Sequence, residues 1–435
     1  MANDRLDLVI FGATGFTGRY AVNNMFNLSK KYPDLKWGVA GRSRTKLETL
    51  MEDMAKEGHD TSTIPVLEAE VSSAGSLAAM CRRARVLVNC CGPYRLYGEP
   101  VVTAAIENGC HHVDVSGEPQ FIESMQLKYH AAAAAAGVFV VSACGFDSVP
   151  NDLGVLYLQR HFPGVLHSVE SYLSVKVDPA VAAEAKETGL VHYGTWESLV
   201  YSLANYGEVK QLRKQLYPTP MPKSEPKLQH RFVVHKADSR WCVPFPGADR
   251  SVLYRTHRHL HEEEKQHPVQ FAAYVKTPGL VYAVAAVVTG MVLFLLSKLP
   301  FTSGLLLRHP SVFSLGAVTR RGPSARVAAS STAAFILKGR GWSDSRLVGN
   351  TGVDTEMVAK VVCKNPGYGM TTTALLLCAI TILKERDNMP KTGGVLTTGV
   401  AFRKTNLINT LIENDITFQI VKQDEITNED KNKNE

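Results

Sequence analysis

The sequence predicts an α/β fold: a Rossmann-type doubly wound parallel sheet, followed by a second mixed α/β domain that carries an apolar membrane-seeking segment. Three observations predict this arrangement. Short β-rich runs alternate with helix-length segments over the first 150 residues, a glycine-rich turn follows the first run, and residues 277–297 contain no charged side chain. We therefore divide the chain into a Rossmann domain at 1–150, a mixed domain at 151–276 and 308–435, and the apolar segment at 277–307.

The composition excludes several classes of protein. With 45% hydrophobic and 20% charged residues, the chain is neither disordered, collagenous nor a multi-span membrane protein. A net charge of +7 is too small to indicate nucleic acid as a partner. Eight cysteines without a CxxC spacing predict free thiols rather than a disulfide framework or structural zinc. Residues 1–6 lack the parts of a secretory signal, so we expect the protein on the cytosolic side.

The first domain begins with six strand-like runs that are joined by segments long enough for a helix. Parallel strands need such crossover connections, so the alternation predicts a doubly wound parallel sheet. The expected strands lie at residues 6–11, 37–40, 64–68, 86–90, 112–115 and 138–142.

A turn rich in glycine lies between the first strand and the first helix. Its sequence, GATGFTG, follows the apolar run 6–11 and precedes a helical pattern at residues 21–26. A turn without side chains lets backbone N–H groups approach a pyrophosphate at the start of a helix, where the helix dipole favours anions. The alternative is a glycine turn that binds nothing. The residues expected to contact a dinucleotide here are Gly12, Thr14, Gly15, Phe16, Thr17 and Gly18.

The end of the second strand indicates which dinucleotide binds. A site for NAD usually has an acidic residue here for the ribose 2′-hydroxyl, whereas this chain has Arg42, Ser43 and Arg44. A guanidinium and a hydroxyl suit the extra 2′-phosphate of NADP, so NADP is expected and NAD is less favoured. The alternative is that Arg42 and Arg44 are exposed residues that precede the next helix.

The other site residues follow the fourth, fifth and sixth strands. Ligands of an open parallel sheet bind outside the carboxyl ends of its strands, so we expect Gly92, Pro93 and Ser116 beside the nicotinamide half of the cofactor. Reduction also needs a proton donor, and Tyr94 and Asp147 are the catalytic candidates. The alternative for Tyr94 is a ring packed on the cofactor, and for Asp147 it is an amino-terminal cap of the next helix.

The second domain is predicted to contain strands at 169–177, 333–337, 357–363 and 416–421 and a helix at 371–384. Four prolines between residues 218 and 226 predict an extended surface segment. Histidines and glutamates at 257–267 resemble metal ligands, but alternating exposed residues are commoner, and no metal is expected.

The apolar segment is long enough to reach across a bilayer. As a helix, residues 277–297 would extend about 31 Å, which is close to the thickness of the hydrocarbon core. A second apolar arm at 299–307 could turn back to the same surface, and a hairpin of this kind can enter the phospholipid monolayer of a lipid droplet. Four basic residues that suit anionic head groups follow the arm: Arg308, Arg320, Arg321 and Arg326. The alternative is a helix that is wholly buried or lies in a dimer interface.

Several runs together resemble the saccharopine dehydrogenase-like oxidoreductase family. They are GATGFTG, AGRSRTKL, NCCGPYRLYGEPV, VDVSGEPQF and CGFDSVPNDLG, with HYGTW and TGGV in the carboxyl half. The resemblance implies an NADP-type Rossmann domain, oxidoreductase activity, and members that associate with membranes and lipid droplets. The namesake reaction reduces an imine between an aminoadipate semialdehyde and glutamate, whereas similar bacterial proteins resemble enoyl reductases that act on lipid intermediates.

The residues and the resemblance together favour an NADPH-dependent oxidoreductase that reduces a C=N, C=O or C=C bond of a small-molecule or lipid substrate. We expect it on the cytosolic face of membranes or lipid droplets, and a homodimer remains open. Two other functions fit the same features. One is an NADP-binding scaffold on lipid droplets with weak turnover, and the other is a genuine saccharopine reductase of the lysine pathway.

Overall fold

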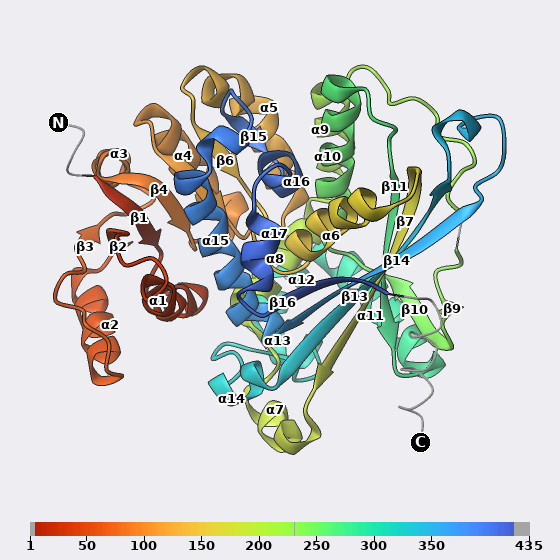
Figure 1. The fold of residues 1–435 in the computed structure, drawn as a ribbon. Helices are drawn as coiled ribbons and strands as arrows, with labels where there is room; N and C mark the ends of the chain where they lie inside the picture. Colours follow the sequence, from red (N-terminus) through yellow and green to blue (C-terminus); the bar gives the residue numbers. More distant parts are fainter. Residues whose placement is uncertain (1–4, 230, 422–435) are drawn as a thin grey trace.

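The computed structural model describes residues 5–229 and 231–421. Within these residues the chain forms two seven-stranded sheets and a small two-stranded one, with helices packed around them (Figure 1). This architecture confirms the predicted fold class.

The first sheet is parallel throughout. Its order is β15 (Gly394–Leu396), β6 (Phe139–Val141), β5 (His111–Asp114), β4 (Ala84–Asn89), β1 (Leu6–Phe11), β2 (Trp37–Gly41) and β3 (Val66–Glu68). The six expected strands are all present, with ends shifted by at most a few residues. Since the chain leaves β1 in one direction for β2 and β3 and later returns to β4, the carboxyl edge beside β1 is where an open sheet of this kind binds ligands.

Helices cover both faces of this sheet. The side chains of β1 alternate, so Leu8 and Ile10 pack with α1 (Phe16–Ser29) and α2 (Arg44–Lys56), while Val9 and Phe11 pack with α3 (Ala74–Arg83) and α4 (Tyr94–Glu107). Helix α5 (Pro119–Ala135) lies beside α4 and contacts β15. Both faces of the sheet are therefore buried, as the apolar strands of a parallel sheet require.

Two elements of this first layer come from the carboxyl-terminal part of the chain. Strand β15 pairs with β6, and α15 (Thr371–Lys384) packs against α1, β4 and β5. The helix has the predicted limits. A domain boundary at residue 150 stays a proposal. Strand β15 adds the edge strand of the first sheet, and α15 packs against that sheet, although both follow residue 150 in the chain.

The second sheet is mixed. Its order is β16 (Ile416–Val421), β14 (Thr355–Lys364), β13 (Ser331–Trp342), β7 (Val165–Val177), β11 (Gln270–Thr277), β10 (Arg240–Pro244) and β9 (His235–Ala237). Helix α6 (Ser148–His161) covers one face, and an added Cβ at Gly154 would stand 2.5 Å from Leu337, so helix and sheet are in close contact. The four strand runs predicted for this domain all lie within these strands.

Smaller elements complete the described chain. The remaining helices are α7 (Ala182–Thr188), α8 (Tyr193–Ala204), α9 (Glu208–Leu216), α10 (Asp249–Glu264), α11 (Leu280–Ser297), α12 (Pro300–Arg308), α13 (Pro310–Phe313), α14 (Ala325–Ala329), α16 (Thr398–Phe402) and α17 (Leu407–Ile412). Strands β8 (Val191–His192) and β12 (Val318–Thr319) pair in parallel. The proline-rich stretch has neither helix nor strand at 217–229, in agreement with its composition.

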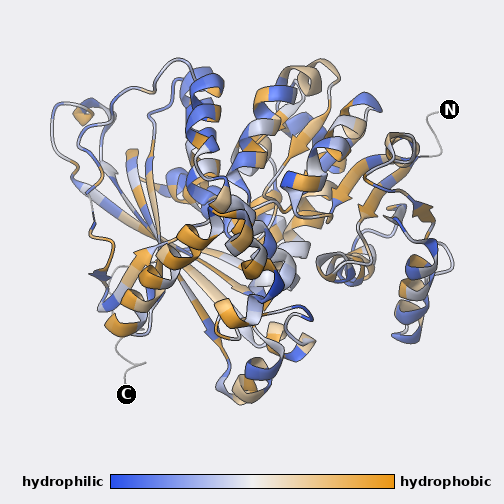
Figure 2. Cartoon of the chain, turned by 180° about the vertical axis from the view of Figure 1, so that it is seen from behind, coloured by the Kyte–Doolittle hydropathy of each residue, from blue (hydrophilic) through white to orange (hydrophobic). Residues whose placement is uncertain are grey.

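The apolar segment forms a hairpin of two helices, α11 and α12, which contact each other. Only Ala283, Leu293 and Ser297 of α11 are buried, and hydrophobic residues run along the whole helix (Figure 2). The alternative of a wholly buried helix is therefore wrong for this chain. A second helix of sufficient length and hydropathy, which includes α15, is 78% buried and belongs to the core.

Candidate functional site

The glycine turn has the backbone geometry of an anion-binding cradle. Gly12 adopts φ +78°, which favours glycine, and its N–H donates to the carbonyl of Ala40. Helix α1 begins at Phe16, and neither a capping side chain nor an acidic residue satisfies its first turn. The N–H groups at the start of α1 are therefore available to an anion.

The glycines of this turn have no room for a side chain. An added Cβ would lie 2.7 Å from Sγ of Cys91 at Gly12, 3.2 Å from the carbonyl of Gly12 at Gly15, and 2.1 Å from the same carbonyl at Gly18. Gly15 is exposed, and Thr14 and Thr17 beside it are half-buried. These residues fit a pyrophosphate, so the cradle suits the dinucleotide that the sequence predicts.

The residues after β2 form an exposed basic corner. Arg42 is exposed, and the described residues give it no ion pair. Ser43 caps α2 by accepting a hydrogen bond from the N–H of Lys46. Arg44 points along α2 and pairs with Glu48 at 2.9 Å. Arg42 is thus the guanidinium free for a 2′-phosphate, while Arg44 is already engaged.

Tyr94 lies in the interior rather than at the surface of the site. Its hydroxyl donates to the carbonyl of Asn89 at 2.9 Å and accepts from the N–H of Val115 at 3.3 Å. Burial and the nearby Asp114 raise the pKa of the phenol well above its usual value. The hydroxyl therefore joins the ends of β4 and β5, a geometry that favours positioning over proton donation.

Two polar residues fix the loop after β5. The Ser116 hydroxyl accepts the N–H of Glu118, and the Glu118 carboxylate accepts the N–H groups of Tyr94 and Arg95 at 2.9 Å each. Glu118 thereby caps α4 from a neighbouring loop, and burial raises its pKa. Ser116, Gly92 and Pro93 all lie at the carboxyl edge, where the sequence placed them, although the Ser116 side chain is buried.

Asp147 occupies the position before α6 without capping it, because its side chain accepts no hydrogen bond from the helix. Its backbone adopts φ +74°, which few residues other than glycine adopt. Oδ1 is buried without a partner among the described residues. Burial, together with the charge of Asp249, raises the pKa of this carboxyl well above its ordinary value. Burial thus favours the neutral, protonated form of this acid, and its catalytic role stays a prediction.

Helix α8 lies across the carboxyl edge of the first sheet. At its start, the rings of His192 and Phe16 stack with centroids 4.4 Å apart and planes 12° apart. Near its middle, the Ser198 hydroxyl donates to the Glu118 carboxylate at 2.8 Å. The helix therefore extends from the glycine turn to the loop after β5, and a ligand at this edge would lie beneath it.

A line of titratable side chains follows one side of α8. Tyr193, Glu197 and Tyr201 are spaced by four residues, so they lie on one side of the helix. Burial raises the pKa of Glu197, and the nearby Glu118 raises it further. The guanidinium of Arg320 lies 4.6 Å from the centre of the Tyr193 ring. This set can hold a proton at the carboxyl edge.

Sequence reasoning missed these three residues. A spacing of four residues indicates one face of a helix, but it does not show which part of the protein that face contacts. The contact between Ser198 and Glu118, which joins residues far apart in the chain, supplies that information.

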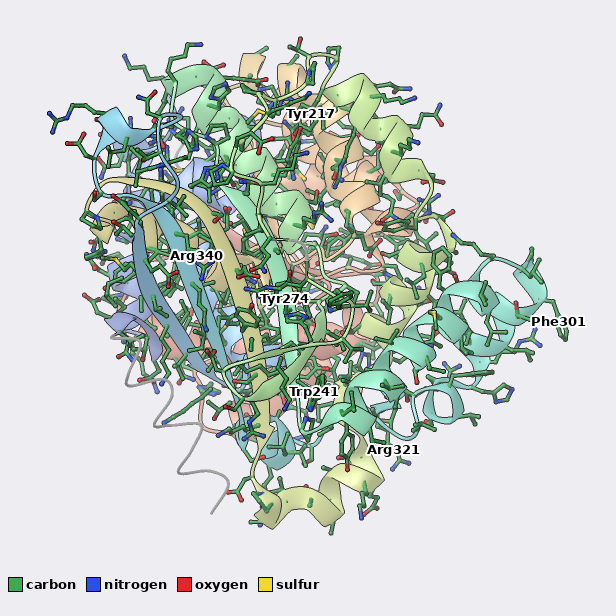
Figure 3. All side chains as sticks on the ribbon, turned by 90° about the vertical axis from the view of Figure 1, so that its right-hand side faces the viewer. Tyr217, Trp241, Tyr274, Phe301, Arg321 and Arg340 are labelled. Carbon is green, nitrogen blue, oxygen red and sulfur yellow. The ribbon has the colours of Figure 1, made fainter. Side chains whose placement is uncertain are left out.

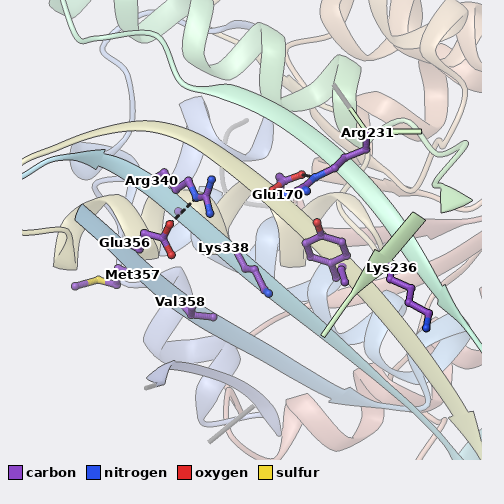
Figure 4. A pocket seen from close by; sticks show the side chains of 11 residues that line it. Glu170, Arg231, Lys236, Lys338, Arg340, Glu356, Met357 and Val358 are labelled. Atoms are coloured by element: carbon purple, nitrogen blue, oxygen red, sulfur yellow. Dashed lines mark hydrogen bonds and ion pairs between the residues drawn. The ribbon is translucent and has the colours of Figure 1, made fainter. Parts of the chain in front are cut away.

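Two cavities of the described chain lie outside this edge. One, of about 100 Å³, lies on the face of the second sheet opposite α6 (Figure 4). Two ion pairs lie within it, Arg231 with Glu170 and Arg340 with Glu356. The other, of about 430 Å³, lies among α4, α5 and α9.

Comparison with known proteins identifies the family. The family described as "Saccharopine dehydrogenase NADP binding domain" matches residues 8–141, which contain the glycine turn and Arg42. The human saccharopine dehydrogenase-like oxidoreductase is 37% identical over 427 residues, which cover 96% of this chain and 98% of the relative. The chain belongs to the saccharopine dehydrogenase-like oxidoreductase family.

Other members and a solved structure agree with this assignment. A Caenorhabditis elegans relative, named lipid droplet localized protein, is 36% identical and covers 96% of this chain and 98% of the relative. The apo saccharopine dehydrogenase (L-Glu forming) of Saccharomyces cerevisiae aligns with a TM-score of 0.52 at 13% identity over 96% of this chain and 100% of its own. That likeness shows a shared fold. The oxidoreductase family and its NADP-binding domain are thus established for this chain, as the sequence predicted.

Proposed function

We propose that this family member is an NADPH-dependent oxidoreductase that reduces a C=N, C=O or C=C bond of a lipid substrate at a membrane or lipid-droplet surface. The observation that carries the proposal is the carboxyl edge of the first sheet, where the glycine cradle, Arg42 and the titratable side chains of α8 lie. NADPH, when bound, supplies the hydride, and the other atom of the double bond must receive a proton.

The residues of α8 are better placed to hold that proton than Tyr94. Burial raises the pKa of the Glu197 carboxyl, and Tyr193 lies one turn away on the same side of α8, so either an Oε of Glu197 or Oη of Tyr193 can carry the proton. The hydroxyl of Tyr94 is engaged by two backbone groups. Asp147 remains a second candidate, because burial raises the pKa of its carboxyl and its Oδ1 has no partner among the described residues.

The charges at the edge favour a lipid over a dicarboxylic amino acid. A dicarboxylate would need cations that converge on it, but Arg95 is paired with Glu208 at 2.7 Å. The residues that face the edge from α8 and from the loop after β5 include the acids Glu197 and Glu118. This arrangement argues against a saccharopine-type substrate, and the exposed apolar hairpin supports a lipid.

Turnover tests the proposal directly. Purified protein is incubated with NADPH and with either lipid extract or a mixture of amino and keto dicarboxylates, while NADPH loss and product mass are followed. Consumption with lipid alone supports the proposal, and consumption with dicarboxylates alone supports the lysine-pathway reductase. Binding of NADPH without consumption in either mixture would leave the scaffold as the function.

A substitution at Glu197 tests the proton donor. Glu197→Gln should lower turnover by at least about tenfold and flatten its pH profile, because general acids contribute about 10²–10⁴-fold, while NADPH affinity stays unchanged. Glu356→Gln, the same change at a residue of the second sheet that is paired with Arg340, is the control. An unaltered pH profile in Glu197→Gln would assign the proton to another residue.

A further inference from the structure

One side of α11 is covered by the protein, and the end of the apolar hairpin at Phe301 extends beyond the neighbouring elements (Figure 3). One side of α11 contacts α8, β10 and α12, so that side cannot meet lipid. Its other side and α12 expose large apolar residues, and Phe301, 78% exposed, points away from the body of the molecule (Figure 3). The apolar side of α11 is therefore the side that a lipid surface can reach.

The covered side of the hairpin is bonded to the helix above the candidate site. Trp196 of α8 is buried against Leu293 and Leu306, and its indole N–H donates to the carbonyl of Leu306 at 2.9 Å. At the other end, Nζ of Lys298 donates to the last carbonyls of α8, those of Leu203 at 2.7 Å and Ala204 at 3.0 Å. Helix α8 is thus the single layer, about 10–12 Å thick, between the hairpin and the carboxyl edge.

Exposed apolar residues continue from the hairpin to the place where α8 meets α4. The ring of Tyr206, 63% exposed, lies edge-on to Phe294 of α11. Beyond it, Leu96 and Tyr97 in the first turn of α4 are 44% and 42% exposed, and α4 contacts α8, which carries Tyr201. We call Leu96, Tyr97, Tyr201 and Tyr206 the α4–α8 junction.

We propose that the α4–α8 junction is the entry for an amphiphilic lipid, whose polar, reducible end reaches the carboxyl edge while its hydrocarbon chain stays against the hairpin in the lipid layer. This inference rests on the proposed function, and it adds the substrate class and its route. A single leaflet suffices for such binding, so the same surface serves a bilayer or a droplet monolayer. Tyrosines at the junction suit the boundary between head groups and hydrocarbon, because their rings are apolar and their hydroxyls are polar.

Photolabelling of the full chain on phosphatidylcholine vesicles tests the route. Two sixteen-carbon fatty alcohols are used, one with a diazirine next to the hydroxyl and one with it near the chain end. We expect the first to label peptides that contain Tyr97 or Tyr201, and the second to label α11 and α12. Equal labelling of both regions by both probes, or label from the first probe on the hairpin alone, would overturn the proposal, as would failure of the protein to float with the vesicles.

Variants separate the junction from the rest of the surface. The double substitution Leu96→Ser with Tyr97→Ser should reduce junction labelling at least tenfold relative to hairpin labelling, and flotation should persist. Phe232→Ser, at an 84% exposed residue before β9, is the matched control and should change neither. NADPH binding of the unmodified protein is measured in a separate titration. If the protein does not bind NADPH, the proposed function is wrong, whereas labelling in the wrong region rules out only the proposed route.

Discussion

Arg42 is predicted to determine the preference for NADPH over NADH. It directly follows β2, is exposed, and has no ion pair among residues 5–229 and 231–421. Its neighbour Arg44 is equally basic, but its guanidinium is held by Glu48 at 2.9 Å. The two arginines therefore make a matched pair in which only one is free for a phosphate.

The expected effect of Arg42→Ala follows from its exposure. Two unit charges 4 Å apart attract by about 1 kcal/mol in water and about 4 kcal/mol at an effective dielectric constant of 20. A charge-assisted hydrogen bond contributes about 1.5–3 kcal/mol. For an exposed guanidinium we take about 2–3 kcal/mol, so NADPH affinity should fall about 30- to 150-fold. NADH lacks the 2′-phosphate, and its affinity should change less than about twofold.

Arg44→Ala should weaken NADPH binding by less than about fivefold, because an exposed pair along a helix contributes under about 1 kcal/mol. Calorimetric titration with both dinucleotides at low and high salt measures these values. The preference for NADPH should shrink at high salt, since salt screens exposed charges. Equal loss of NADPH and NADH affinity in Arg42→Ala, or an equal loss in Arg44→Ala, would refute the reasoning.

Three further substitutions probe the site and its support. Gly12→Ala should abolish tight dinucleotide binding and lower the free energy of unfolding by about 2–4 kcal/mol, because its Cβ would stand 2.7 Å from the Cys91 sulfur. The control is Gly58→Ala, at φ +92° in open space, which should lower the free energy of unfolding by about 1 kcal/mol and leave binding unchanged. Denaturation curves and calorimetry measure the two effects. Tyr94→Phe should lower the free energy of unfolding by about 1–2 kcal/mol and retain turnover, and an inactive but stable variant would restore Tyr94 as the donor. Burial raises the pKa of Asp249 from 3.8 to about 7, so the folded state keeps a proton that the unfolded state loses, and stability falls as pH rises through this range. Asp249→Asn should make that fall less steep in denaturation curves, and an unchanged slope would contradict the assignment.

Local signals were sufficient for the first half of the site. The glycine turn and Arg42 lie within a few positions of a strand end, so their places follow from local spacing, while their roles in binding stay a prediction. The structure adds only the distances that exclude a Cβ. The strands were found for the same reason, because apolar runs between turns are local features.

The rest of the site depends on contacts between distant segments. Strand β15 has only three residues, and it is placed by its pairing with β6. No local sequence pattern predicts that pairing. The hydroxyl of Tyr94 is engaged because the ends of β4 and β5 approach within reach of one ring. The pKa of Glu197 is raised mainly by the burial of its carboxyl in the folded chain and to a smaller extent by Glu118. Each of these features depends on tertiary contacts, which the local sequence does not reveal.

Two apolar helices show why composition does not decide what a helix contacts. Helix α11 and the helix that includes α15 both have the length and hydropathy to span a membrane, but 11% of the first and 78% of the second is buried. Helix α15 fills the space between α1 and the first sheet, where every side needs apolar side chains. Helix α11 has a protein neighbour on one side only, so its remaining apolar surface requires lipid or another partner. Because the covered side is bonded to α8, any partner that holds α11 also fixes the helix above the candidate site.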